Sequence, residues 1–191
     1  MGCLFSAPIT TTMIKTTSRT ISILPEFTPE FPVSPFQKIF DHSWKIAYIQ
    51  SVYDGDTCTA SFYFNRMWYN FRIRMIGYDS AEMKPLKSDP NRDQEIKEAI
   101  RAKNKLIELV DKKWVVLETR GFEKYGRVLG NIYTIPQSLI YQHTNFEDYT
   151  PNSTLIEMCG LYRNKSLEYH VNYFMVEKKF GVPFMVKNNK E

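Results

Sequence analysis

The sequence has 191 residues, of which 43% are apolar and 15% aromatic, enough for one domain with a hydrophobic core and a tail. Its three cysteines include no C-x-x-C pair, which argues against a disulfide framework and a zinc site. No run of about 18 apolar residues is present to span a bilayer. The net charge of +4 fits a polyanionic partner without requiring one.

The first six residues, MGCLFS, match the N-myristoylation pattern M-G-x-x-x-[ST], with Gly2 as the acceptor. One myristoyl chain binds membranes only marginally, so we expect a second anchor, and Cys3 is the obvious site for palmitoylation. The sequence therefore predicts membrane association at the cytoplasmic face, in a eukaryotic or virus-infected cell. The alternative is a chance match in a soluble cytoplasmic protein, because the pattern is short.

Residues 1–42 are rich in Thr and Ser and then in Pro, without sustained periodicity. We expect this part to be a poorly ordered tether between the lipid anchor and the domain. The domain is expected to cover residues 43–186, and residues 187–191 form a polar tail.

Three segments alternate between apolar and polar residues, as half-buried strands do: residues 44–53, 57–64 and 67–78. A helix of about 18 residues is expected next, with Asp89 as its N-cap and Pro90 as its first residue. Two more strands are expected at residues 113–119 and 128–133. Five short strands with a helix after the third predict a five-stranded OB-fold barrel, an α+β fold with about three helices in all.

The C-terminal part is expected to be helical. Thr154 and Glu157 form a capping box that opens a short helix ending at Gly160. Ser166 is expected to cap a second helix, for which Gly181 is the stop. The tail from Val182 to Val186 is expected to pack back on the domain.

Four carboxylates lie where the first strands end: Asp54 and Asp56 in an Asp-Gly-Asp-Thr turn, and Asp79 and Glu82 after the third strand. The glycine between the first two lets the backbone bend sharply, so that both can face one point. No His or Cys lies nearby, so any metal held here is expected to be a hard cation such as Ca²⁺ or Mg²⁺.

Two arginines accompany these carboxylates. Arg74 lies five residues before Asp79, and Arg127 lies in the turn Glu-Lys-Tyr-Gly-Arg between the last two strands. A guanidinium group matches a phosphate with paired donors, so carboxylates for a divalent ion together with two arginines indicate a phosphodiester-cleaving site.

Three motifs in this order, DGDT, RMIGYDSAE and EKYGRVLGNIY, resemble those of the thermonuclease (staphylococcal nuclease-like) family over about residues 44–133. The resemblance implies a Ca²⁺-dependent endonuclease that hydrolyses DNA and RNA to 3′-phosphate products. It also implies that the aromatic and polar segment 135–152 is an insertion, since the family has a shorter turn there.

The resemblance implies a role for each matching residue. Asp56, Asp79 and the backbone carbonyl of Ser80 would hold Ca²⁺, and Asp54 would act through a metal-bound water. Glu82 would orient or deprotonate the attacking water. The other implied residues are Arg74 and Arg127 as catalytic donors to the phosphate, and Lys124 and Tyr125 as contacts to the substrate.

One departure from the family is Ala81, which replaces the usual proline between the second aspartate and the glutamate. Two other interpretations stay open. An OB-fold surface also serves as a non-catalytic module that binds nucleic acid or protein. The carboxylates can also form no more than a solvated turn cluster. No protein partner can be inferred.

Overall fold

The structure is a computed structural model that describes residues 40–165 and 169–184, with the side chains of residues 161–165 left out. The predicted lipidation sites Gly2 and Cys3, nearly all of the expected tether, the predicted cap Ser166 and the polar tail lie outside the described residues.

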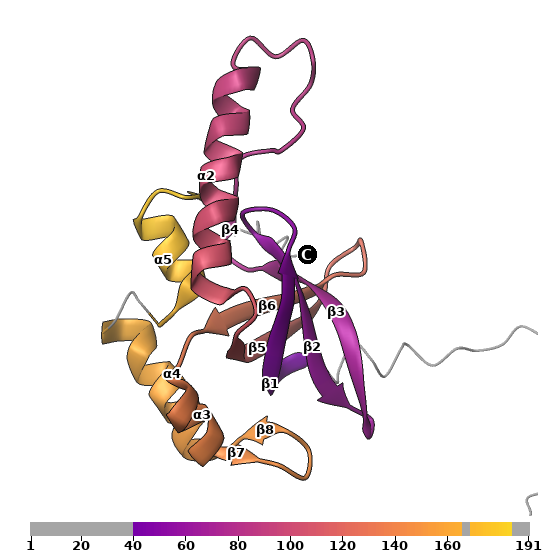
Figure 1. The fold of residues 1–191 in the computed structure, drawn as a ribbon, viewed down its shortest axis with the longest axis vertical. Coiled ribbons are helices and arrows are strands. Elements are labelled where there is room, and N and C mark those ends of the chain that lie inside the picture. Colours follow the sequence, from indigo (N-terminus) through magenta and orange to yellow (C-terminus); the bar gives the residue numbers. More distant parts are fainter. Residues whose placement is uncertain (1–39, 166–168, 185–191) are drawn as a thin grey trace, which may run out of the picture. The chain divides into compact units, whose positions relative to one another are not determined.

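Five strands close into a barrel in the order β1-β2-β3-β6-β5, as Figure 1 shows. Neighbouring strands are antiparallel, except that β3 and β6 run parallel. This arrangement confirms the predicted α+β fold with an OB-like barrel. The barrel strands are β1 Asp41–Val52, β2 Thr57–Phe64, β3 Met67–Met75, β5 Trp114–Phe122 and β6 Val128–Tyr133.

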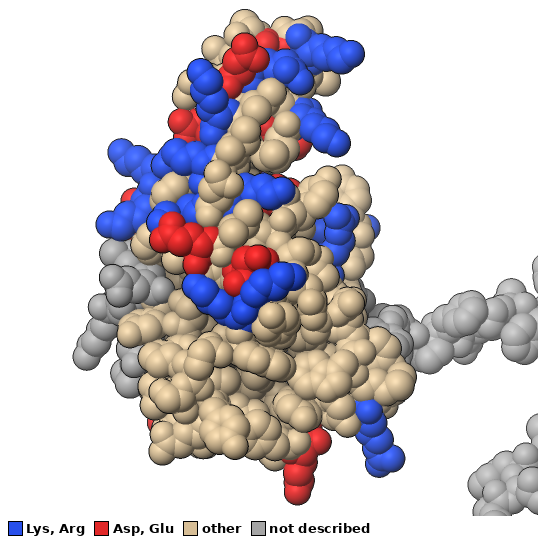
Figure 2. All heavy atoms as spheres, viewed as in Figure 1, with Lys and Arg blue, Asp and Glu red and all other residues tan. Residues whose placement is uncertain are grey.

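Helix α2, Arg92–Val110, follows the third strand as predicted. Its cap differs from the prediction: Asn91 is the N-cap, and the Asp89 side chain accepts from the Asn91 backbone N at 2.8 Å within the preceding turn. Charged side chains gather over α2 and the adjoining loops on the face shown in Figure 2, because only one side of this helix is buried.

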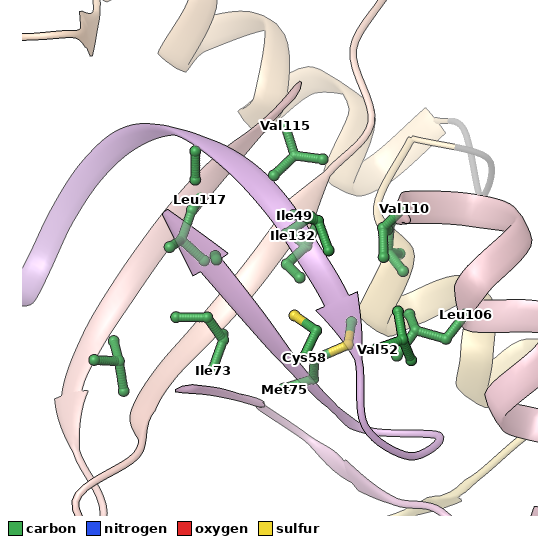
Figure 3. Packing of buried hydrophobic residues seen from close by; sticks show 14 of the residues in the cluster. Ile49, Val52, Cys58, Ile73, Met75, Leu106, Val110, Val115, Leu117 and Ile132 are labelled. Carbon is green, nitrogen blue, oxygen red and sulfur yellow. The ribbon is translucent and has the colours of Figure 1, made fainter. Parts of the chain in front are cut away.

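The barrel interior is filled by the inward side chains of its strands. Figure 3 shows Cys58, Ile73 and Ile132 packed together, with Leu106 and Val110 of α2 beside them. All five are fully buried. The period-2 pattern of the strands and the apolar side of α2 therefore meet in one core.

Phe40 is also fully buried in this core, and it contacts Phe62 and Phe122 edge to face with ring centroids 5.7 and 5.2 Å apart. Asp41 and Ser43 then pair with β5. The folded domain therefore includes Phe40, which lies slightly before the expected start at residue 43.

The segment 135–152 has no clear sequence period, yet it forms helix α3, Gln137–Gln142, and a hairpin of β7, Thr144–Asn145, with β8, Thr150–Pro151. With the following helix it covers a second hydrophobic cluster on the outside of the barrel. Members of that cluster are Ile46, Val116, Tyr133, Ile135, Ile140, Leu155 and Cys159.

Two of the C-terminal helix predictions were wrong in their bounds. Helix α4, Ser153–Lys165, continues through Gly160, and Asn152 caps it by accepting from the Leu155 backbone N at 3.0 Å. Helix α5, Val171–Glu177, begins after His170, whose side chain accepts from the Tyr173 backbone N at 3.1 Å. Asn and His supplied the side-chain acceptors that the prediction assigned to Thr and Ser. With α2 and α3, the described residues hold four helices, against about three predicted.

The C-terminal segment packs back, as predicted. Strand β9, Val182–Pro183, pairs with β4, Tyr78–Asp79. Gly181 allows this approach, because a Cβ at that position would lie 2.4 Å from the Tyr78 ring and 2.9 Å from the Asp79 carbonyl oxygen. Among the described residues, no helix is long and apolar enough to cross a membrane.

Candidate active site

The Asp-Gly-Asp-Thr turn lies between β1 and β2 and is pressed against α2. A Cβ on Gly55 would lie 2.6 Å from the Cβ of Ser80 and 2.7 Å from that of Ala102, so the turn requires glycine for space. Asp54 stabilises the bend by accepting from the backbone N of Asp56 at 3.2 Å. The turn therefore holds Asp56 directly beside Ser80.

Asp56 is 7% exposed and is surrounded by donors. Its Oδ1 receives the Thr57 hydroxyl at 2.9 Å and lies 2.8 Å from Nη1 of Arg74. Its Oδ2 receives the backbone N and the Oγ of Ser80 at 2.8 and 2.9 Å. Four charge-assisted contacts compensate for the burial of this carboxylate.

Arg74 bridges the two aspartates of the site. Its Nη1 contacts Asp56, and its Nη2 forms an ion pair with Oδ1 of Asp79. The side chain of Arg74 is 13% exposed and that of Asp79 is 45% exposed. The guanidinium therefore lies between an inner and an outer carboxylate, and the outer one faces solvent.

Arg127 joins the same network through Thr57, whose Oγ1 it contacts from Nη1 at 3.1 Å. Its Nε and Nη2 both donate to the carboxylate of Glu123. These hydrogen bonds are the main reason that the pKa of Arg127 is raised. One chain of contacts therefore links Arg127, Thr57, Asp56, Arg74 and Asp79.

Both arginines line an open cleft of about 790 Å³ at this end of the barrel. Asp79 and Glu123 line it with them. Three further lining residues were given no role from the sequence, and only Asn131 among them stands in one of the recognised motifs. These are Arg120 on β5, Asn131 on β6 and Phe184, which β9 brings back beside β4.

Glu82 lies outside this group. It is exposed in the loop after β4, its carboxylate accepts from the backbone N of Lys84 at 3.1 Å, and its own backbone N contacts Glu95 of α2 at 3.4 Å. It is not among the residues that line the cleft. Of the six residues implied as catalytic or metal-binding by their side chains, the structure brings five together and leaves Glu82 outside the lining of the cleft.

Lys124 and Tyr125 lie at the tip of the turn between β5 and β6. The Lys124 ammonium is 4.8 Å from the centroid of the Tyr125 ring, and Tyr125 is 71% exposed. Gly126, with a φ of +77°, closes the turn and points Arg127 back toward the barrel. The tip therefore presents a cation and an aromatic face beside the arginine.

The side chains that surround Arg74 offer only oxygen ligands, which is the ligand type that a hard cation prefers. Asp79 is half exposed, and Asp54 lies behind Asp56, where burial and the Asp56 charge raise its pKa. No cluster of three or more His, Cys, Asp or Glu side chains at metal-binding spacing occurs within residues 40–165 and 169–184. The Ser80 residue engages Asp56 through its backbone N and hydroxyl.

A comparison with models of known protein families gives no match, and a search of curated proteins gives none either. The function of this chain is therefore inferred from the geometry of this site and from its motifs.

Proposed function

We propose that this chain is a phosphodiesterase of the endonuclease type that cleaves DNA and RNA, and that it belongs with the thermonuclease-like enzymes. The observation that carries the proposal is the linked set of Arg127, Thr57, Asp56, Arg74 and Asp79. Arg74, Asp79 and Arg127 of this set line one cleft. Two guanidinium groups fixed beside two carboxylates suit a reaction in which negative charge develops on a phosphate.

In this proposal the two arginines bind the phosphate that is cleaved. Both now donate to carboxylates, Arg74 to Asp79 and Arg127 to Glu123. A phosphate entering the cleft competes with these carboxylates for the same donors. Arginine suits the exchange better than lysine, because its planar fork offers paired donors to either anion.

Asp56 and Asp79 would hold Ca²⁺, with the Ser80 carbonyl as a further ligand and Asp54 acting through bound water. The ion would polarise the phosphoryl oxygen and offset its charge. Glu82 would orient or deprotonate the attacking water, which requires its loop to bring the carboxylate from the rim into the cleft. Lys124 and Tyr125 would contact the substrate at the turn tip. The products would carry 3′-phosphates.

A second candidate function is a non-catalytic OB-fold module that binds nucleic acid or protein. The position of Glu82 outside the cleft favours it, since such a module needs no group to activate water. Activity separates the two functions, because only the first predicts cleavage.

The direct test is degradation of plasmid DNA and of RNA by the purified chain in a divalent-ion series. We expect cleavage with Ca²⁺, none with chelator, and a loss of at least a hundredfold in Glu82→Gln with the melting temperature unchanged. Glu147→Gln, a change of another exposed glutamate in the hairpin far along the chain, is the matched control. Chelator-resistant cleavage that Glu82→Gln leaves intact would refute this mechanism.

We also propose that Gly2 myristoylation and Cys3 palmitoylation hold the enzyme on a membrane. In cells, Gly2→Ala should move the protein from the membrane to the soluble fraction, and Cys3→Ser should weaken its membrane retention, because one acyl chain binds only marginally. Equal partition of the wild type and Gly2→Ala would remove the anchor.

A further inference from the structure

The outer surface of the barrel carries an aromatic platform at the end away from the cleft. We define the platform as Tyr48, Tyr63, Trp68, Trp114 and Tyr149. Trp68 is 42% exposed and Trp114 37% exposed, with their ring centroids 5.8 Å apart. Tyr149, from the 135–152 segment, lies 4.8 Å from Trp68, so this insertion fixes one edge of the platform.

A hollow of about 370 Å³ adjoins the platform, with Gln50, Ser61 and Asn70 in its lining. Gln50 Nε2 donates to the Ser61 hydroxyl at 2.8 Å, and that hydroxyl donates to Asn70 Oδ1 at 2.5 Å. The side-chain Oε1 of Gln50 and the side-chain Nδ2 of Asn70 make no hydrogen bond within the described part of the chain. An acceptor and a donor beside an aromatic surface match the edge and the face of a nucleobase.

Strand β3 connects this platform to the cleft. Every second residue of β3 lies on its outward side, and β3 pairs in register with β2. The outward residues are Trp68, Asn70, Arg72 and Arg74. Trp68 and Arg74 are six residue steps apart along the strand, a distance of about 20 Å. Arg72 lies between them, with its guanidinium 4.7 Å from the centroid of the Tyr53 ring.

The distribution of charge from the platform along β3 to the cleft favours a polynucleotide as the partner of this face. Figure 2 shows charged side chains gathered over one part of the molecule and sparse over the rest of the same face. The platform has no charged member, whereas Arg72, Arg74 and Arg127 follow toward the cleft. Aromatic rings can stack on unpaired bases, and side-chain amides can hydrogen-bond to the base edges. The arginines that follow can bind the phosphates of the same strand. A lipid surface is a poorer match for this face than a polynucleotide. Lipid would remove water from the Gln50 and Asn70 amides without replacing their hydrogen bonds.

We propose that this outward face of β1, β2 and β3 binds a single-stranded polynucleotide and leads it into the cleft, with bases on the platform and phosphates on Arg72 and Arg74. The proposal rests on the proposed nuclease function for the cleavage step alone. A duplex has its bases paired and stacked, so it cannot use the platform. The preferred substrate is therefore single-stranded and extends several nucleotides from the cleaved bond.

Binding is measured first, without cleavage, on the full chain carrying Gly2→Ala in chelator, with a fluorescent oligothymidylate. We expect Trp68→Ala to weaken binding about tenfold, because one stacked base contributes about 1–3 kcal/mol. Arg72→Ala, at an exposed position that leaves the fold intact, should weaken binding and reduce the magnitude of the salt slope by about 0.7. Leu86→Ala, at a residue 77% exposed outside this face, is the matched control and should bind like the parent.

Kinetics then separate this proposal from the proposed function. With Ca²⁺, Trp68→Ala should raise KM for a long single strand, leave kcat unchanged and leave dinucleotide cleavage unchanged. If the parent cleaves but Trp68→Ala and Arg72→Ala leave KM and Kd unchanged, the strand-binding proposal is wrong and the nuclease proposal stands. If the parent does not cleave but binding depends on Trp68, the nuclease proposal is wrong and the strand-binding proposal stands. Tryptophan-dependent binding to phosphatidylcholine vesicles, with none to the oligonucleotide, would assign the face to a membrane and overturn the proposal.

Discussion

Ser80 donates twice to the same oxygen of Asp56, from its backbone N at 2.8 Å and from its hydroxyl at 2.9 Å. These contacts fasten the loop after β4 to the turn between β1 and β2. Asp56 thus has a structural role besides the metal-binding role that its motif implies. The two roles predict different consequences for the two residues.

Asp56→Asn should destabilise the fold as well as abolish activity. The buried Arg74 guanidinium loses its inner partner, and breaking a buried ion pair of this kind costs about 3 kcal/mol. Ser80→Ala removes only the hydroxyl and should cost about 1 kcal/mol. Urea unfolding measures both. Equal stability of Asp56→Asn and the wild type would show that the Arg74 contact adds nothing to the fold.

Arg74→Lys tests the bridge between the two aspartates. A lysine ammonium has no planar fork with which to hold Asp56 and Asp79 at the same time. We expect a loss of at least a hundredfold in kcat/KM and only a modest loss of stability. Lys97→Arg, at an exposed position of α2, is the control for a change of cation type. Activity near the wild-type level would mean that Arg74 acts only as a charge.

The barrel could be predicted because period 2 in the strands and helical spacing in α2 both report burial directly. The turn aspartates and Arg74 could be predicted because they occupy strand ends that the fold must bring together. The position of Glu82 could not be predicted, since a loop without periodicity does not encode where its side chains point. Nor could Phe184, which reaches the cleft through long-range pairing of β4 with β9.

The segment 135–152 marks a different limit. Its apolar residues Ile135 and Ile140 pack on the outside of the barrel, with Ile46 and Val116. From the sequence alone, Ile46 and Val116 look like solvent-facing residues on the outside of the barrel. In the structure the 135–152 segment covers them. The hydrophobic pattern within one segment does not show that its apolar residues pack against a distant segment. For this reason α3 could not be predicted from the sequence.

Gly181→Ala should reduce activity through Asp79. The added Cβ would meet the Tyr78 ring and the Asp79 carbonyl oxygen, so β9 has to separate from β4. We expect at least a tenfold loss of kcat/KM, together with faster hydrogen exchange of the Phe184 amide, which donates to the Gly77 carbonyl oxygen at 2.9 Å. Gly160→Ala, within α4 where a Cβ meets nothing within 4 Å, should leave activity unchanged. A Phe184 amide that stays protected in Gly181→Ala would show that the protein tolerates the added Cβ.

Cys58 sets part of the alkaline stability. Burial raises the pKa of its thiol from 9.0 to about 12. The folded chain therefore keeps this proton between those values while the unfolded chain loses it. The free energy of unfolding should fall as the pH rises through this window, by up to about 1.4 kcal/mol per pH unit. Tyr78, whose pKa is also raised by burial, acts in the same direction. Denaturant unfolding between pH 8 and pH 11 should show a shallower fall in Cys58→Ala, and parallel curves would contradict this.

Glu123→Gln tests whether Arg127 is held back from the substrate. Glu123 receives two donors of this arginine, so a phosphate has to displace a charged competitor. A glutamine keeps the size and removes the charge, which leaves Arg127 more available. We expect a lower KM for a dinucleotide, by about three- to tenfold, because a partly buried ion pair of this kind contributes about 1 kcal/mol. Arg127→Ala combined with Glu123→Gln provides the control, since without the arginine the glutamine should have no effect. A KM that falls equally with and without Arg127 would show that Glu123 repels the phosphate directly and does not act through the arginine.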